Sequence, residues 1–222
     1  ADLDTAAALS AHQGPLMQSG QSCACASRIL VHDSVYDAFA EHLLAVIGAA
    51  RIGDPLDPAT AFGPVISAAS ADRIIATVDR AVAERSGELL TGGYRMLKSE
   101  LAQGYYVAPT VLGNVDNRAA LAQTETFGPV VSMIRFTDDA EAVRIANDTA
   151  YGLNAFIHTR DLVRAHTVAR QLEAGSIWIN QLSRISPQGP YGGYKHSGAG
   201  RTGGLEGLQE FQQVKNIRIG LA

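Results

Sequence analysis

The sequence of 222 residues has only two cysteines, Cys23 and Cys25, one residue apart in the stretch SGQSCACASR. A cysteine thiolate is a strong nucleophile, and small neighbours let a carbonyl approach and expose backbone N–H groups to an oxyanion. Three uses compete: metal ligands, core packing or nucleophilic catalysis. Cys-x-Cys supplies only two of the four ligands of tetrahedral zinc, and the six histidines are dispersed, so no metal site is predicted.

The two remaining uses divide naturally between the two cysteines. Cys25 leads directly into the apolar stretch ASRILV, where a small buried thiol is a common core residue. Cys23 lies in a turn of small residues between a predicted helix and a predicted strand. Residue type alone favours core packing for a free cysteine, so a nucleophile at Cys23 remains a hypothesis at this level.

Composition and charge narrow the class of protein. The chain is 46% hydrophobic with a net charge of −4, which suits one domain with a substantial core. No long basic cluster indicates nucleic-acid binding, and no apolar run approaches the ~18 residues of a membrane span. No leader peptide is seen and two cysteines form no disulfide framework, so a cytoplasmic protein is expected. The helical opening ADLDTAAALSA has no Met, so we expect a fragment or truncated product.

Elements that would position the cysteines follow from periodicity. Helices are predicted over 2–13, 35–50, 67–85, 138–148 and 161–175. Strands are predicted over 27–32, 87–93, 104–115, 129–136, 152–159, 176–180 and 214–221. The run PVVSMIRF is continuously apolar, which is typical of a strand buried on both faces. This alternation predicts an α/β fold with a mostly parallel sheet flanked by helices, over 1–213, followed by a C-terminal strand over 214–222.

Two motif matches in the glycine-rich segment 189–207 are rejected. Residues 198–203 match G-x-G-x-x-G, but no strand precedes them and too few residues follow for a dinucleotide-binding unit. Tyr191 and Lys195 have the Y-x-x-x-K spacing of short-chain dehydrogenases, which requires one helical face. Gly192 and Gly193 lie between them and disfavour a helix by about 1 kcal/mol each, so a loop is predicted.

A series of motifs along the whole chain resembles the aldehyde dehydrogenase superfamily. The stretch GQSCACASRILVHDSVYDAF is similar to the family's active-site segment, with its G-Q-x-C pattern. The stretches GYYVAPTVL, ETFGPVVSMIRF, AYGLNAFIHTRD, AGSIWIN and PYGGYKHSGAGR each have a family counterpart, in the family's order. The resemblance covers residues 1–222 and implies the family's catalytic domain, with a C-terminal strand that joins subunits into a homo-oligomer, a dimer or tetramer.

The resemblance implies roles for seven residues. Cys23 corresponds to the nucleophile, which attacks an aldehyde, forms a thiohemiacetal and then a thioester, and is freed by water as the carboxylic acid leaves. Glu125 corresponds to the glutamate that binds the nicotinamide ribose of NAD or NADP, and Phe127 to the aromatic residue beside that ribose; without the motif, Glu125 would be read as a solvated charge and Phe127 as core. The substrate entrance is expected at Gln181, Ser183, Ile185 and Tyr191.

Other parts of the family pattern are not in this sequence. The dinucleotide-binding domain, the E-L-G-G segment with its general-base glutamate, and the oxyanion-hole asparagine all precede the nucleophile in the family. The resemblance therefore implies the catalytic portion of an NAD(P)-dependent enzyme acting on a small-molecule aldehyde. Family members that transfer the acyl group to coenzyme A or act on semialdehydes are not separated from it by these residues. The alternative hypothesis is a remnant without turnover that serves as an assembly or interaction domain.

Overall fold

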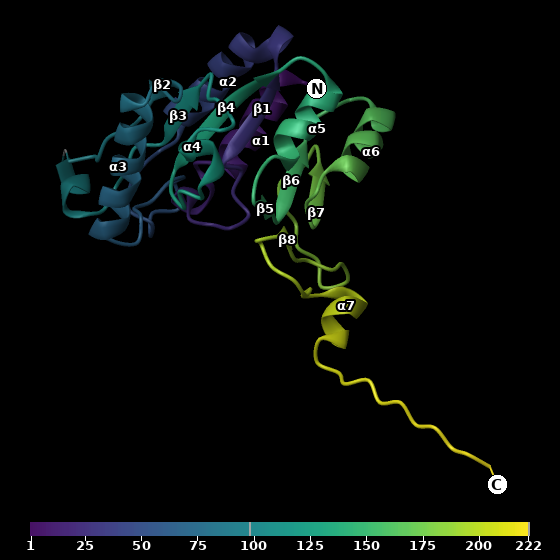
Figure 1. Ribbon diagram of the computed structural model, residues 1–222. Helices are drawn as coiled ribbons and strands as arrows, with labels where there is room; N and C mark the ends of the chain where they lie inside the picture. Colours follow the sequence, from purple (N-terminus) through teal and green to yellow (C-terminus); the bar gives the residue numbers. More distant parts are fainter. Residues whose placement is uncertain (98, 222) are drawn as a thin grey trace.

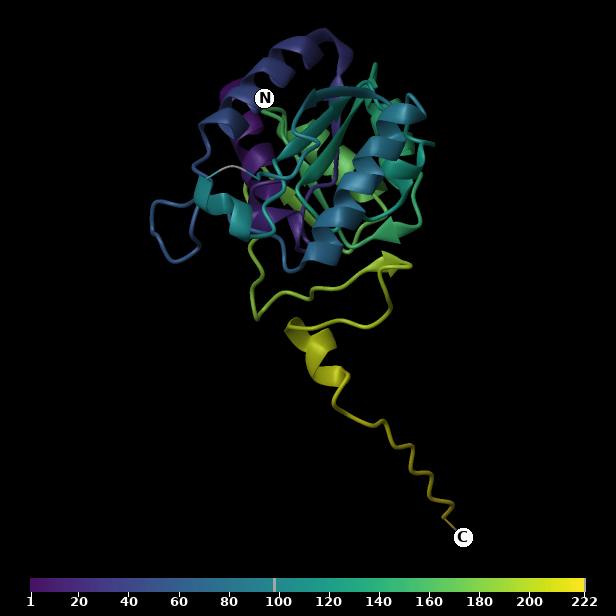
Figure 2. The same cartoon turned by 90° about the vertical axis from the view of Figure 1, so that its left-hand side faces the viewer.

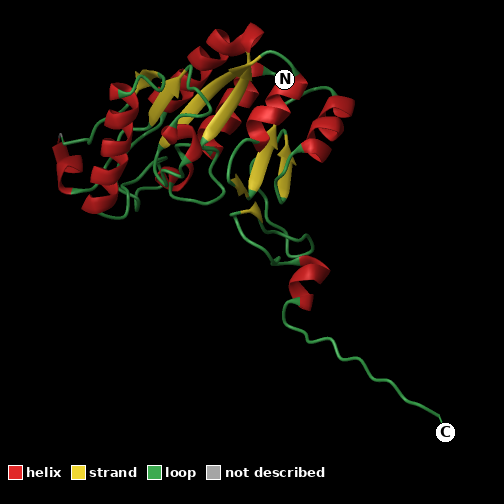
Figure 3. Cartoon of the chain, viewed as in Figure 1, coloured by secondary structure: helices red, strands yellow, loops and turns green. Residues whose placement is uncertain are grey.

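The computed structural model describes residues 1–97 and 99–221 as a mixed α/β fold (Figure 1). Helices and strands alternate along the chain, as Figure 3 shows by colour. The α-helices are α1 (Leu3–Gln13), α2 (Tyr36–Ala49), α3 (Ala68–Ala83), α4 (Ala120–Gln123), α5 (Asp139–Asn147), α6 (Leu162–Gln171) and α7 (Gly204–Gln209). The strands are β1 (Arg28–His32), β2 (Glu88–Thr91), β3 (Thr110–Gly113), β4 (Val130–Phe136), β5 (Tyr151–Gly152), β6 (Asn154–Ile157), β7 (Ser176–Ile179) and β8 (Tyr194–Lys195).

The central sheet has the strand order β1-β4-β3-β2. Strand β4 pairs in parallel with β1 and with β3, and β2 is an antiparallel strand at the edge. A second pair, β6 and β7, is also parallel, whereas β5 and β8 pair antiparallel. The predicted fold class, a mostly parallel sheet flanked by helices, is therefore confirmed.

The sheet separates two apolar layers, and β4 contributes to both. Val131 and Met133 face the layer that α1 and α2 cover, while Val130 and Ile134 face the layer that α3 covers. Figure 2 shows these helices on opposite sides of the sheet. All four side chains are buried, because a strand covered on both faces cannot alternate apolar and polar residues. This confirms the interpretation of PVVSMIRF.

The C-terminal segment differs from its expected structure. Residues 212–221 pair with no strand in the described part of the chain, and the segment runs away from the body (Figure 1). The alternation in VKNIRIGL predicts which side chains share a face, but a strand also requires a partner edge. The role of 214–222 in joining subunits stays a prediction. Within the described residues, no helix combines the length and apolar character needed to cross a bilayer.

Candidate active site

Cys23 lies at the tip of a turn between α1 and β1. The turn is closed by the Cys25 N–H, which donates to the Ser22 carbonyl at 3.0 Å, so Cys23 and Ala24 occupy its central positions. The Ser22 hydroxyl also accepts from the Ala24 N–H at 3.2 Å. The Cys23 side chain is exposed. The small residues of this stretch thus form a tight turn that presents one thiol to solvent.

Gln13, at the end of α1, holds this turn in place. Its buried side chain donates to the Ala24 carbonyl at 3.0 Å and accepts from the Ser183 N–H at 2.8 Å. On the other side, the Gln21 amide oxygen accepts from the Ile66 N–H at 2.8 Å. The turn is therefore fixed by hydrogen bonds to the end of α1 and to Ile66, and Gln13 in turn links it to Ser183.

Gly20 brings the cysteine turn against the loop that precedes β4. Its φ is +69°, and a Cβ at this position would lie 1.9 Å from the Gly128 carbonyl oxygen. Only glycine tolerates both the left-handed backbone and this close approach. The motifs GQSC and ETFGPV, about a hundred residues apart, therefore meet backbone to backbone.

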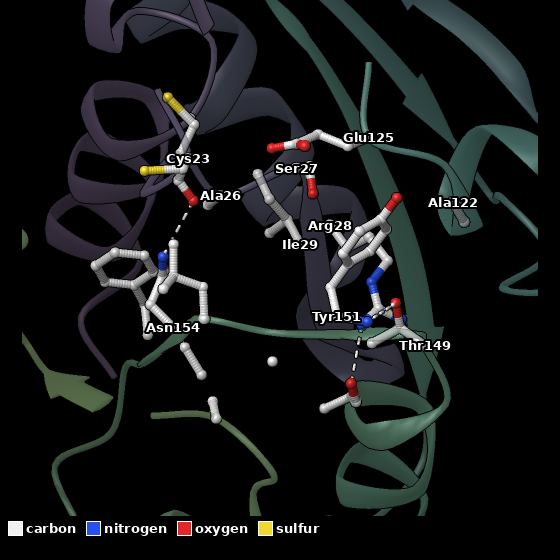
Figure 4. A pocket seen from close by; sticks show the side chains of 18 of the residues that line it. Cys23, Ala26, Ser27, Arg28, Ile29, Ala122, Glu125, Thr149, Tyr151 and Asn154 are labelled. Atoms are coloured by element: carbon white, nitrogen blue, oxygen red, sulfur yellow. Dashed lines mark hydrogen bonds between the residues drawn. The ribbon is translucent and has the colours of Figure 1, made fainter. Parts of the chain in front are cut away.

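Glu125 and Phe127 lie on that loop and share a pocket with Cys23. The pocket has a volume of about 500 Å³ and is lined by all three residues. Figure 4 shows the Cys23 side chain, the Glu125 carboxylate and the Asn154 amide around this cavity. Phe127 has a φ of +48°, a strained conformation for an aromatic residue, and the residue stays 43% exposed. The structure thus brings together the predicted nucleophile and both predicted cofactor-binding residues.

Cys25 has a different environment from Cys23. Its thiol is partly buried and donates to the Met17 carbonyl at 3.4 Å. Burial, reinforced by the nearby Cys23 and Glu125, raises the pKa of Cys25 to about 11, although the Ser22 contacts oppose this. Cys25 is therefore the more buried of the two thiols, in keeping with a packing role.

Alkylation should distinguish the two thiols. With a pKa of about 11, roughly one Cys25 in a thousand is a thiolate at about pH 8, and only the thiolate reacts. We expect iodoacetamide to label Cys23 first under native conditions, as measured by peptide mass spectrometry over time. Raising the pH toward 11 should bring Cys25 into reaction. Labelling of Cys25 ahead of Cys23 at pH 8 would contradict this assignment.

The four predicted substrate residues fall in two groups. Gln181, Ser183 and Ile185 follow β7 and do not line the pocket of Cys23 in the described chain. Ser183 instead contacts Gln13 through its backbone, and Gln181 and Ile185 are exposed. Tyr191 does not line this pocket either, but its hydroxyl lies nearer to Cys23: burial, and then the Cys23 thiol, raise the pKa of Tyr191. Their role in substrate binding stays a prediction.

Lys195 is not aligned with Tyr191 for shared chemistry. The segment between them is not helical, as expected from its glycines. Lys195 donates to the carbonyls of Asn147 and Thr149 at the end of α5 and forms an ion pair with Glu173. These contacts give Lys195 a structural role.

Two residues of the site were not found from sequence. Asn154, the first residue of β6, donates from its side chain to the Cys23 carbonyl at 3.4 Å. Arg28, the first residue of β1, is partly buried and donates to the Asn117 side chain at 2.6 Å. It also donates to the carbonyls of Ile145 and Ala146 at the end of α5. Arg28 thereby ties the strand after the nucleophile to α5, with burial lowering the pKa of its guanidinium.

Comparison with known proteins agrees with this architecture. The model of the aldehyde dehydrogenase family matches residues 1–217. An NAD-dependent aldehyde dehydrogenase from Sinorhizobium meliloti has 38% sequence identity and a TM-score of 0.93, covering 99% of this chain and 42% of that one. Betaine aldehyde dehydrogenase from Staphylococcus aureus, solved with NAD⁺, has 37% identity and a TM-score of 0.92, covering 95% and 41%. An aldehyde dehydrogenase from Mycobacterium tuberculosis, also complexed with NAD⁺, has 35% identity and a TM-score of 0.90, covering 96% and 43%.

The fold and the sequence both define one class of protein. The chain belongs to the aldehyde dehydrogenase family. It spans about two fifths of the length of the three solved relatives. Two of those relatives hold NAD⁺, in agreement with the nicotinamide cofactor that the sequence motifs imply.

Proposed function

We propose that this chain carries the nucleophile and part of the nicotinamide site of an NAD(P)-dependent aldehyde dehydrogenase, which oxidises a small-molecule aldehyde to the carboxylic acid. The observation that carries the proposal is one pocket lined by an exposed cysteine, a carboxylate and an exposed aromatic ring. Family membership indicates the type of reaction, and the lining of the pocket indicates the residues that take part in it.

Cys23 acts as the covalent catalyst. Its thiolate adds to the aldehyde carbon and forms a thiohemiacetal whose oxygen carries the negative charge. The backbone N–H of Cys23 is the donor that we assign to that oxyanion. After oxidation the substrate is a thioester on Cys23, and attack by water releases the carboxylic acid and the free thiol. Gln13 and Gln21 keep the turn in place through these steps.

Glu125 and Phe127 fit the nicotinamide end of a dinucleotide. A carboxylate accepts charge-assisted hydrogen bonds from a ribose diol, and an exposed ring offers an apolar surface beside it. A bound oxidised nicotinamide would supply the chemistry of hydride acceptance. The strained φ of Phe127 supports this reading, because such conformations cluster at ligand sites.

The test of this assignment is Glu125→Gln in a full-length family enzyme that joins this chain to the preceding dinucleotide-binding domain, with aldehyde oxidation followed through the absorbance of the reduced nicotinamide. Loss of a charge-assisted hydrogen bond costs about 1.5–3 kcal/mol, so we expect the KM for NAD⁺ or NADP⁺ to rise about tenfold or more. The KM for the aldehyde should change much less. Glu84→Gln, at the exposed end of α3, is the matched control. Equal cofactor KM values for Glu125→Gln and the unmodified protein would exclude the ribose role.

A second candidate function, subunit assembly into a homo-oligomer, is favoured by the C-terminal segment. Its apolar side chains are almost fully exposed: Val214, Ile217, Ile219 and Leu221. An unpaired, extended apolar segment is a template for pairing with another copy. We expect the double variant Ile217→Asp/Ile219→Asp to form smaller assemblies, which sedimentation velocity would report as a lower molecular mass of the particle. Asn216→Asp is the control, and an unchanged mass in the double variant would argue against assembly through this segment.

A further inference from the structure

The Tyr191 hydroxyl is buried close to the nucleophile. Within residues 1–97 and 99–221 this oxygen has no hydrogen-bond partner of acceptable geometry. The Cys23 thiol and the Asn154 amide are nevertheless near enough to act on it: burial and then Cys23 raise the pKa of Tyr191, and Asn154 lowers it. Buried hydroxyl groups are normally paired, so an unpaired one points to an acceptor that forms in another state of the site.

Tyr191 is positioned by contacts of both its backbone and its ring. Its backbone N–H and carbonyl form two 2.8 Å hydrogen bonds with Thr202. Its ring packs against Trp178, with ring centroids 6.3 Å apart, and Trp178 stacks on Phe156 at 5.3 Å. Trp178 and Phe156 are paired residues of β7 and β6. The backbone bridge to Thr202 and the ring contact with Trp178 of β7 therefore position the hydroxyl.

Asn154 connects the same pair of strands to the cysteine turn. It is paired with Ser176 of β7, and its side chain reaches the Cys23 carbonyl (dashed line in Figure 4). Gln13 holds the neighbouring carbonyl, that of Ala24, from α1. The backbone of the turn is thus supported from two sides, and Asn154 and Tyr191 both approach Cys23 from the side of β6 and β7.

We propose that Asn154 and Tyr191 are positioning residues for Cys23. Asn154 fixes the turn through the Cys23 carbonyl, and the Tyr191 hydroxyl donates a hydrogen bond to the Cys23 sulfur when that sulfur is a thiolate. The proton stays on Tyr191 throughout, so no additional group changes its charge. This inference rests on the proposed role of Cys23 as the nucleophile.

The test is the rate of Cys23 alkylation in Tyr191→Phe, which removes only the hydroxyl. Losing a hydrogen bond to an anion lowers the thiolate population and so slows alkylation. The thiolate that remains is more basic and therefore more nucleophilic, which offsets about half of the loss of rate on a logarithmic scale. We therefore expect the second-order rate with iodoacetamide at about pH 8 to fall about three- to tenfold. Peptide mass spectrometry assigns the label to Cys23, and circular dichroism checks the fold.

Two further variants control this experiment. Tyr194→Phe makes the same change three residues along, where the ring faces the Arg201 guanidinium at 5.6 Å, and should leave the rate unchanged. Asn154→Ala should also slow alkylation of Cys23. In the double variant Asn154→Ala/Tyr191→Phe, the reduction in rate should be smaller than the product of the two single reductions, because both residues act on Cys23.

Titration of the Tyr191 hydroxyl measures a pKa that a purely structural role of this residue would not make dependent on Cys23. The phenolate absorbance of Tyr191, taken as the difference between the unmodified protein and Tyr191→Phe, should titrate above the ordinary tyrosine value of about 10. In Cys23→Ser the pKa of Tyr191 should fall, because the neighbouring thiolate that opposes its ionisation is gone. An unchanged pKa, or an unchanged alkylation rate in Tyr191→Phe, would overturn the inference. No labelling of Cys23 in the unmodified protein would instead overturn the proposed function.

Discussion

Cys23→Ser should abolish the rapid release of nitrophenolate when the protein is mixed with 4-nitrophenyl acetate. An activated ester acylates a nucleophilic thiolate without any cofactor, so the unmodified chain should release a burst of about one nitrophenolate per chain. A hydroxyl at this position is far less nucleophilic than a thiolate. We expect the acylation rate to fall by at least about 10³-fold, as removal of a covalent nucleophile does elsewhere.

Cys25→Ser is the matched control for this experiment, since it removes the only other thiol. Cys25 is partly buried and its pKa is raised to about 11, so its loss should leave the burst amplitude unchanged. The burst should be followed by slow release, because each further turnover requires hydrolysis of the thioester on Cys23. A burst that survives in Cys23→Ser and disappears in Cys25→Ser would reverse the two assignments.

Gly20→Ala should have the second largest effect, on stability and reactivity together. The added Cβ would meet the Gly128 carbonyl at 1.9 Å, and the φ of +69° is itself unfavourable for alanine. Both backbones would have to separate, so we expect the free energy of unfolding to fall by about 3 kcal/mol or more. Because Gly20 holds the cysteine turn against the Glu125–Gly128 loop, alkylation of Cys23 should slow as well. Urea denaturation and the iodoacetamide rate measure the two effects.

Gly48→Ala is the control for that substitution. Gly48 lies near the end of α2, is exposed, and has open space where the Cβ would go. Alanine favours a helix over glycine, so this change should raise stability by up to about 1 kcal/mol and leave Cys23 labelling unaffected. Similar destabilisation in both variants would show that the contact between Gly20 and Gly128 has no special importance.

Sequence reasoning succeeded where periodicity or motif order carries the information. The apolar run of β4 predicted a strand buried on both faces, and Val130 and Val131 do face opposite layers. The resemblance of GQSC and ETFGPV to family motifs predicted a shared site for Cys23 and Glu125. Their proximity cannot be read from either segment alone, because it depends on the contact of Gly20 with Gly128.

The rest of the site depends on packing that a sequence does not display. Asn154 lies in an ordinary strand pattern, and only the pairing of β6 with β7 places its amide against Cys23. Gln181, Ser183 and Ile185 follow a strand in a segment without periodicity, so nothing local fixed their direction, and they lie outside the pocket. The C-terminal alternation is a different case: a strand needs an edge to pair with, the described chain offers none there, and the strand over 214–222 stays a prediction.

The most direct test of Cys23 as the covalent catalyst is to locate the acyl group itself. The protein is mixed with 4-nitrophenyl acetate at about pH 8, quenched in acid to preserve thioesters, digested and mapped by mass spectrometry. We expect one acetyl group on the peptide containing residues 19–28, lost on treatment with hydroxylamine and placed on Cys23 by fragmentation. Acetylation confined to Cys25, or no thioester on this peptide despite nitrophenolate release, would contradict the assignment of Cys23 as the nucleophile.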